Sequence, residues 1–455
     1  MEGDMRNKII KRIKVKILED PGFLGKFATM VGEFGALFGE IKTVHIGKNF
    51  KIREMDVYVK DEETFDTIAD TIRKMEGVDL IEVKDVVKEY HINGKIKVCS
   101  NVEIESMDDL SIVYTPGVAQ VCKLIQENPD YAYKFTSINN NVAIATNGTA
   151  ILGLGDIGAV AGMPVMEGKA VLFRELAGIN GIPILINSKD PKVIIQTLKA
   201  IAPTFGAIKL EDIKAPECFE IEDTLDRELD IPVVHDDQHG TAVVVLSALL
   251  NIAQYTYINL KRVSIGIIGL GAAGMGISKL LKAFGVQEIY GADINENALK
   301  MFKKLGGKPA DLKTVMEKSK IVIATTGVPG LIKKEMVKPK QVILALSNPD
   351  PEITPEDALN AGALYAADGK AINNALGFPG LFRGALNARA KTINNAMKIA
   401  AARTIAKFTM DGDLVPNILN KKVHQAVAKA VEEVALKTGV VKYLSIVEEE
   451  IEEEL

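Results

Sequence analysis

Residues 262–274 read R-V-S-I-G-I-I-G-L-G-A-A-G, an apolar strand that runs directly into a glycine turn. The next residues, 275–284, contain no proline and suit a helix. Glycines at such a turn permit the close approach of a pyrophosphate, and the N-terminus of the helix stabilises its charge. A second strand, 288–292, follows and ends in Asp293, nineteen positions after Gly274. The stretch therefore predicts a Rossmann-type domain.

An acid after the second strand of such a domain accepts hydrogen bonds from the adenosine ribose hydroxyls and repels a 2′-phosphate. Asp293 therefore favours NAD as the cofactor, with NADP as a weaker one. Two further apolar strands, 321–325 and 342–346, end in polar loops at the same edge of the sheet. The predicted nucleotide contacts lie in the glycine turn and these loops: Gly269, Gly271, Ala272, Ala273, Gly274, Asp293, Thr326 and Asn348.

A second glycine motif, G-L-G-D-I-G at 153–158, matches the same fingerprint by its letters. The segment behind it contains Pro164 and Gly168, so we expect neither a long crossover helix nor a nucleotide site there. A helical run is expected to begin only at Lys169. A lysine at such a place is exposed by default, but if it points into a site, desolvation and a nearby cation would lower its pKa and make it a usable base.

Two pairs of adjacent acids follow apolar runs between residues 209 and 241. Glu211-Asp212 and Asp236-Asp237 each come just past the end of an expected buried strand, where open α/β sheets bind their ligands. Carboxylates without a cysteine or histidine cluster suit a hard cation such as Mg²⁺ or Mn²⁺. Acid pairs in solvated loops are equally common, and the spacing alone leaves both interpretations open.

The composition is that of an ordinary globular protein. The 455 residues are 47% hydrophobic and 25% charged, and length alone predicts about three domains. A net charge of −5 argues against a nucleic-acid partner, and no apolar run approaches the roughly 18 residues of a membrane span. Three scattered cysteines, Cys99, Cys122 and Cys218, favour reduced thiols and a cytoplasmic location.

Residues 8–88 predict a separate β-α-β-β-α-β module of the ferredoxin-like kind. This order and the turn E-D-P-G-F-L-G at 19–25 resemble an ACT domain, a module that binds small effectors in many metabolic enzymes. A plain dimerisation module is an equal alternative, because the topology hosts many functions. We expect the chain to divide into residues 1–90, 91–240, 241–380 and 381–455. The last part comprises helices and an acidic tail, 448–455, which is expected to be solvated.

Several motifs, taken together in this order, resemble the malic enzymes in their short prokaryotic, NAD-dependent form. The resemblance covers about residues 95–440, and its motifs are Y-T-P-G-V-A from Tyr114, G-L-G-D-I-G with M-E-G-K ending at Lys169, L-E-D at 210–212, H-D-D-Q-H-G-T at 235–241, S-N-P at 347–349 and N-N-A-L-G-F-P-G at 373–380. It implies an α/β fold with a substrate and metal domain beside the NAD-binding domain, and a homodimer or higher homo-oligomer.

The resemblance also implies roles for individual residues. The metal ligands would be Glu211, Asp212 and Asp237. Lys169 would be the general base and Tyr114 the general acid, with Asp236 orienting or tuning the lysine. Asn348 and Asn374 would hold the carboxylates of malate. The reaction implied is the oxidation of malate by NAD and its decarboxylation to pyruvate, assisted by Mg²⁺ or Mn²⁺.

The sequence departs from the larger members of that family in two ways. They carry an arginine before the first glycine motif, where this chain has Thr149-Ala150, so the carboxylate must be clamped from elsewhere, and Arg383 is one candidate. The ACT-like module is an addition whose effector is open. Two alternatives remain, an NAD-dependent amino-acid dehydrogenase and a catalytically silent sensor; the first needs no divalent cation, and the acid pairs argue against the second.

Overall fold

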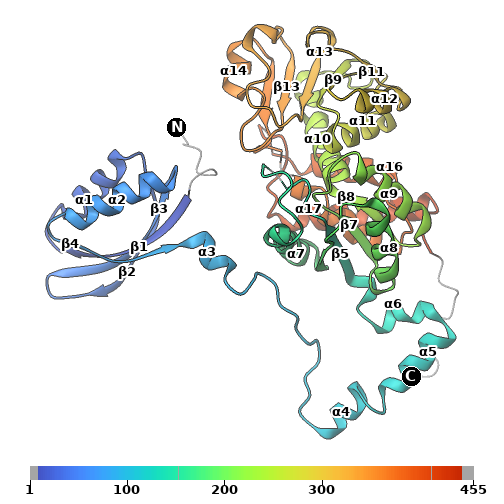
Figure 1. Ribbon diagram of the computed structural model, residues 1–455, viewed down its shortest axis with the longest axis horizontal. Helices are drawn as coiled ribbons and strands as arrows, with labels where there is room; N and C mark the ends of the chain where they lie inside the picture. Colours follow the sequence, from blue (N-terminus) through green and yellow to red (C-terminus); the bar gives the residue numbers. More distant parts are fainter. Residues whose placement is uncertain (1–8, 152, 373, 411, 443–455) are drawn as a thin grey trace. The chain divides into compact units, whose positions relative to one another are not determined.

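The chain forms two compact units, Met1–Lys97 and Val98–Leu455, in a computed structural model (Figure 1). The structure describes residues 9–151, 153–372, 374–410 and 412–442. The first residue of the 373–380 motif and the acidic tail 448–455 lie outside this range.

The first unit has the predicted β-α-β-β-α-β order. Its elements are β1 (Ile9–Leu18), α1 (Phe23–Glu33), β2 (Leu37–Ile46), β3 (Phe50–Val59), α2 (Glu62–Lys74) and β4 (Val78–Asp85). The antiparallel sheet has the order β2-β3-β1-β4. Alternate residues of β1, among them Ile13, Val15 and Ile17, are buried, as expected for a strand with one face on a core. This unit has its own hydrophobic core, which includes Phe27 of α1 and Ile68 of α2.

The second unit contains two parallel sheets. The smaller has the order β6-β5-β7-β8, and its elements are β5 (Asn141–Thr146), α7 (Met163–Ala177), β6 (Asn180–Leu185), α8 (Pro191–Ile201), β7 (Ala207–Leu210), α9 (Glu217–Glu228), β8 (Val233–His235) and α10 (Asp236–Thr256). Because β7 and β8 are parallel neighbours, their carboxyl ends share one edge, and both acid pairs stand at it.

The expectation of no long helix behind residues 153–158 is wrong, because α7 begins at Met163 and includes both Pro164 and Gly168. Pro164 lies in the first turn, where the missing N–H would have no partner within the helix anyway. Lys169 is therefore in the middle of a helix rather than at its start. Gly153 and Gly155 instead form a loop beyond β5, in which Gly155 N–H donates to the carbonyl of Ile151.

The larger sheet is the predicted Rossmann sheet. All six strands are parallel in the order β11-β10-β9-β12-β13-β14, and the elements are β9 (Ser264–Ile268), α11 (Ala272–Phe284), β10 (Glu288–Ala292), α12 (Glu296–Lys304), β11 (Lys308–Pro309), α13 (Leu312–Lys318), β12 (Ile321–Ala324), β13 (Val342–Ala345), α14 (Pro355–Asn360) and β14 (Tyr365–Asp368). The strand order reverses between β9 and β12, the position at which such sheets bind dinucleotides.

Helix α10 connects the two sheets. Fourteen of its residues are buried, and it packs against α11 of the Rossmann part and against α16 (Asn395–Lys407). The other C-terminal helices, α15 (Pro379–Asn387) and α17 (Lys421–Lys437), pack on α7 (Figure 1). The C-terminal helices thus return to a helix that lies against the smaller sheet. The division drawn at residue 240 therefore falls inside a helix, and one hydrophobic core continues across it.

The segment that opens the second unit buries almost nothing. Helices α4 (Met107–Val113), α5 (Val118–Glu127) and α6 (Ala132–Phe135) contain no buried residue. Ten large apolar side chains of residues 98–135 are exposed: Val98, Val102, Ile104, Met107, Ile112, Val113, Tyr114, Val118, Leu124 and Phe135. We call residues 98–135 the apolar arm. In the first unit, α3 (Val86–His91) is likewise unburied. No helix among the described residues is long and apolar enough to cross a membrane.

Candidate active site

Three acids predicted as metal ligands lie together at the carboxyl edge of the smaller sheet. Glu211 and Asp212 follow β7, and Asp237 lies in the first turn of α10; one carboxylate oxygen from each lies within 4.8 Å of the others. Glu211 is 2% exposed and Asp212 5%, which excludes the solvated-loop interpretation. Asp212 has a φ of 52°, a left-handed conformation that aspartate adopts more readily than most residues.

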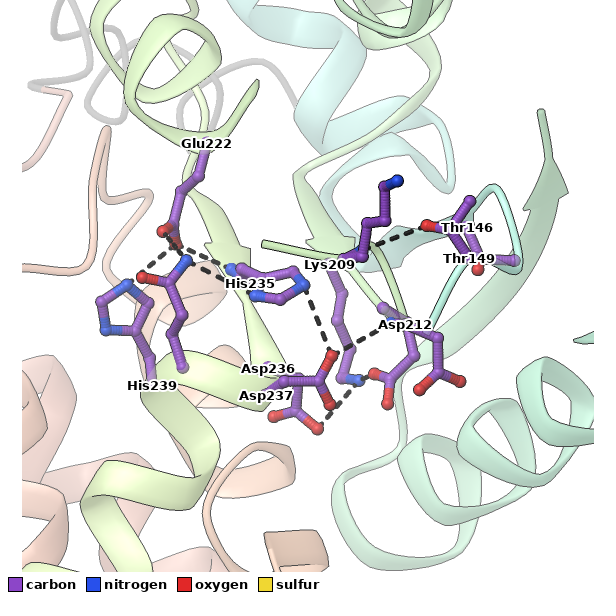
Figure 2. A network of polar contacts seen from close by, with 12 residues as sticks. Thr146, Thr149, Lys209, Asp212, Glu222, His235, Asp236, Asp237 and His239 are labelled. Carbon is purple, nitrogen blue, oxygen red and sulfur yellow. Dashed lines mark hydrogen bonds and ion pairs between the residues drawn. The ribbon is translucent and has the colours of Figure 1, made fainter. Parts of the chain in front are cut away.

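The donor set suits a divalent cation. Oδ2 of Asp212 is buried and accepts no hydrogen bond from the described part of the chain, so it lacks the compensation that a buried oxygen needs. The backbone N–H of Asp212 donates to Oδ2 of Asp237 over 3.1 Å and fixes the two acids relative to each other (Figure 2). Burial and the charge of Asp237 raise the pKa of Asp212 to about 7. A cation at this place would remove the repulsion among these carboxylates.

Lys169 reaches the same cluster from α7. Its Nζ lies 2.9 Å from Oδ2 of Asp236 and 2.9 Å from Oε1 of Glu211, and 5.1 Å from the centre of the Phe378 ring. Burial acts to lower the pKa of Lys169, but the negative charges of Asp236 and the neighbouring acids outweigh it, so the pKa is raised. The expected lowering of the pKa requires a nearby cation as well as burial, and the protein groups by themselves present more negative than positive charge to the lysine.

A second lysine, not anticipated from the sequence, shares the same carboxylate. Lys209 of β7 is completely buried, forms an ion pair with Glu211, and places its Nζ 3.1 Å from Oδ2 of Asp236 (Figure 2). Burial, reinforced by the charge of Lys169, lowers the pKa of Lys209 to about 7 against the attraction of Asp236. The sequence signal was a lysine inside the otherwise apolar run 205–210.

Asp236 is the centre of this arrangement. It is completely buried, and although burial alone would raise the pKa of Asp236, the charges of Lys169 and Lys209 lower it to about 2. A side chain at position 240, one turn further along α10, would displace this carboxylate, because a Cβ there would lie 2.1 Å from Oδ1 of Asp236. The carboxylate is thus held as an anion, with both lysines paired to its Oδ2.

A buried polar network supports the acid edge from behind. Glu222 accepts hydrogen bonds from the backbone N–H of His235 over 2.7 Å and from Nε2 of Gln238 over 2.8 Å, and it pairs with Nε2 of His239 at 2.9 Å (Figure 2). Nε2 of His235 in turn lies 3.4 Å from Oδ2 of Asp237. This network fixes the start of α10, on which Asp236 and Asp237 stand.

The predicted nucleotide contacts lie at the carboxyl edge of the Rossmann sheet. Gly271 caps α11, and Ala272, Ala273 and Gly274 form its first turn. Only glycine fits at position 274, because a Cβ there would lie 1.9 Å from the carbonyl oxygen of Gly269. Asp293 follows β10 and accepts from the backbone N–H of Leu270 over 2.6 Å. It therefore holds the glycine turn, and its place directly after β10 is the one for which the sequence predicts a ribose contact.

The substrate candidates sit on neighbouring loops. Asn348 follows β13 and is partly exposed. Gly369 leaves room for its side-chain amide, because a Cβ at position 369 would lie 2.6 Å from Nδ2 of Asn348. Asn374 opens a short helical turn, Asn374–Leu376, and is also partly exposed. Gly377 in the same loop lies against Gly240 of α10, which brings this loop to the helix that bears Asp236 and Asp237.

Two predicted residues are not brought to the cluster. Tyr114 ends α4 on the apolar arm and is 66% exposed. Arg383 donates to Oδ1 of Asn140 over 2.6 Å and to Oδ1 of Asn387 over 2.8 Å, and it lines a cavity of about 660 Å³ between α7, α15 and α17. None of the acids at the sheet edge lines that cavity, so Arg383 is not placed as a carboxylate clamp.

A Rossmann sheet joined by one buried helix to an edge of acids and lysines defines a nicotinamide-nucleotide oxidoreductase with a site for a divalent cation. Comparisons with known proteins specify the family. Residues 93–226 match the family model "Malic enzyme, N-terminal domain", and residues 246–335 match "D-isomer specific 2-hydroxyacid dehydrogenase, NAD binding domain". The chain belongs to the malic enzyme family.

Individual relatives extend over nearly the whole chain. "NAD-dependent malic enzyme 1" of Bacillus subtilis is 52% identical over 430 residues, which cover 94% of this chain and 98% of that protein. "NAD-dependent malic enzyme" of Geobacillus stearothermophilus is 42% identical and covers 94% of this chain and 95% of its own length. Among solved structures, the malic enzyme of Pyrococcus horikoshii is 40% identical with a TM-score of 0.75, over 81% of this chain and 94% of that one.

Proposed function

We propose that the protein is an NAD-dependent malic enzyme that oxidises (S)-malate and decarboxylates it to pyruvate and CO₂ with the help of Mg²⁺ or Mn²⁺. The observation that carries the proposal is the Lys169 ammonium, held by Asp236 and Glu211 directly beside three acids suited to a divalent cation. The names of the relatives from Bacillus and Geobacillus support NAD as the electron acceptor. An amino-acid dehydrogenase would have no use for the acid cluster.

The chemistry follows from the placement of these groups. Glu211, Asp212 and Asp237 would hold the cation, which, when bound, acidifies the C2 hydroxyl of malate and polarises the ketone formed from it. The charge of the cation would favour the neutral amine of Lys169. In that form Nζ takes the hydroxyl proton as hydride leaves C2 for the nicotinamide, and Asp236 keeps that Nζ oriented. Loss of CO₂ from C3 then leaves an enolate of pyruvate, whose carbon must be protonated by an acid.

We assign the donation of that last proton to Tyr114, and we propose that this tyrosine belongs to the other subunit of a homodimer. Tyr114 lies on the apolar arm, whose ten large exposed apolar side chains would be costly to leave in water. Short helices without a buried face are marginal in water, so the arm needs a partner. A second copy of the chain would provide a surface that covers the arm and a site that Tyr114 can serve. A symmetric dimer in which each arm serves the neighbouring site satisfies this need.

Mixing two inactive variants tests the shared site. Lys169→Ala and Tyr114→Phe should each lower malate turnover by about 10² to 10⁴. If the tyrosine acts across the dimer, unfolding and refolding the two together should restore about a quarter of the parent activity, because half of the dimers are mixed and each has one intact site. A mixture that stays inactive while forming mixed dimers would place both residues in one subunit.

The metal-dependent activity has its own test. Asp237→Asn should abolish malate oxidation with NAD and Mn²⁺ and weaken Mn²⁺ binding measured directly, because one of three anionic ligands is lost. Asp230→Asn serves as the control, since Asp230 is an exposed acid on the segment before β8 with only a 3.5 Å surface pair to Lys391. Normal turnover and Mn²⁺ affinity in Asp237→Asn would contradict the proposal.

For the first unit we propose the ACT-like role of binding a small effector, on the basis of its β-α-β-β-α-β order and its separate core. We further propose a cytoplasmic enzyme. All three cysteines are free, and Cys99 and Cys122 are exposed, as expected in a reducing compartment.

A further inference from the structure

A buried carboxylate outside the acid cluster joins two loops of the Rossmann sheet. Glu352 is completely buried, and its Oε1 accepts hydrogen bonds from the backbone N–H of Thr326 over 2.6 Å, from Oγ1 of Thr326 over 2.8 Å and from Oγ of Ser347 over 2.6 Å. Its Oε2 accepts from the backbone N–H of Ser347 over 3.4 Å. The hydroxyl of Ser347 also accepts from the backbone N–H of Gly327 over 2.8 Å, which closes the network.

The two loops leave neighbouring strands at the edge where a dinucleotide binds. Thr326 follows β12 and Ser347 follows β13, and these strands are parallel partners next to the point where the strand order reverses. Asn348 comes directly after Ser347, so the orientation of its side chain depends on the position of that serine. Glu352 therefore lies behind both Thr326, a predicted nucleotide contact, and the serine that precedes Asn348, a predicted substrate contact.

The chemistry of the network favours a carboxylate. All four groups that face Glu352 are hydrogen-bond donors, and an ionised carboxylate is a pure acceptor, whereas an amide of the same shape presents its own donors. Hydrogen bonds to a charged group are also about twice as strong as those between neutral groups. A glutamine at this position would either leave a donor unpaired or set two donors against each other.

We infer that Glu352 is a positioning residue of the active site, which holds residues 326–330 and 347–350 together so that Thr326 faces the nucleotide and Asn348 faces malate. The inference rests on the proposed function, and it explains a buried acid that takes no part in the chemistry itself. Because Glu352 is completely buried, it would act on substrate and nucleotide through Thr326 and Ser347.

The test compares two isosteric exchanges at buried positions on either side of β13. Glu352→Gln should raise the Kd for NADH, measured by fluorescence without malate, and the KM for malate, each by about five- to tenfold. The matched control is Gln341→Glu, at the amino end of β13, where a 2% exposed amide donates to the carbonyls of Met316 and Ser319. That exchange should lower the Tm but leave Kd and KM within about twofold of the parent.

The outcomes separate positioning from stability. If Glu352→Gln lowers the Tm but leaves Kd and KM within about twofold, Glu352 is merely structural and the inference is overturned. If that variant fails to fold, Ser347→Ala is tested instead. It removes one hydroxyl, which donates to Glu352 and accepts from Gly327, and it must raise the same two constants in the same direction, or the inference fails. The NADH measurement needs no turnover, so a parent protein that binds NADH but does not oxidise malate would refute the proposed function and still test Glu352.

Discussion

The affinity of the acid cluster for Mn²⁺ should depend on pH through Asp212. Burial and the charge of Asp237 raise the pKa of Asp212 to about 7, so the carboxyl group is protonated over much of the range below neutrality. Only the ionised form can ligate a cation, and binding must therefore displace a proton. The affinity should fall as the pH falls, and it should level off above the pKa, where no proton remains to be displaced.

The size of the effect follows from that pKa. One displaced proton weakens the apparent affinity by about tenfold between about pH 8 and about pH 6, which corresponds to ~1.4 kcal/mol. Lys209 has a pKa of about 7 as well, and its protonation acts in the same direction by adding positive charge next to Glu211. The total change is therefore at least tenfold, with one proton attributable to Asp212.

Calorimetry of Mn²⁺ binding at about pH 6, in buffers of different ionisation enthalpy, counts the released protons directly. Asp212→Asn should release about one proton fewer than the parent and bind more weakly at high pH, because an amide carries no proton to lose and no charge. Asp226→Asn is the control: burial also raises the pKa of Asp226, but its carboxylate accepts from Thr392 outside the cluster. Equal proton release by Asp212→Asn and the parent would refute the reasoning.

Three further predictions concern the nucleotide, the first unit and a buried lysine. Asp293→Asn keeps an acceptor for Leu270 but removes the charge, and should raise the NADP to NAD ratio of kcat/KM by about tenfold; an unchanged ratio would exclude Asp293 as the selector. A chain that starts at Val98 should remain folded and oxidise malate, because the first unit has its own core; a folded but inactive truncation would contradict a purely regulatory role. Burial lowers the pKa of Lys398 from 10.5 to about 8, so the unfolded state binds the lysine proton more tightly than the folded state. The free energy of unfolding should therefore rise between about pH 8 and about pH 10.5, by up to ~3 kcal/mol. Urea unfolding should show this rise, and Lys398→Met should remove it.

The sequence alone predicted the elements whose signals are local. The glycine turn at 269–274 with Asp293, and the β-α-β-β-α-β order of residues 8–88, follow from periodicity and from backbone positions that only glycine can occupy. The meeting of Glu211 and Asp237 was also predictable, because both follow buried strands and the carboxyl ends of parallel strands share an edge. Local reasoning failed at Pro164, since a proline in a first helical turn is compatible with the helix it was taken to exclude.

Only the tertiary structure decided how the charges of the site are shared. Lys209 and Lys169 meet at Oδ2 of Asp236 only because β7 and α7 pack beside the start of α10. The pKa of each group then depends on burial and on all surrounding charges, and not on its neighbours along the chain. The same holds for Glu352, a residue in an ordinary polar loop whose burial arises only when β12 and β13 pair. Local periodicity determines which segments become helices and strands, whereas the packing of distant segments determines which polar side chains lose water and therefore acquire new partners and new proton affinities.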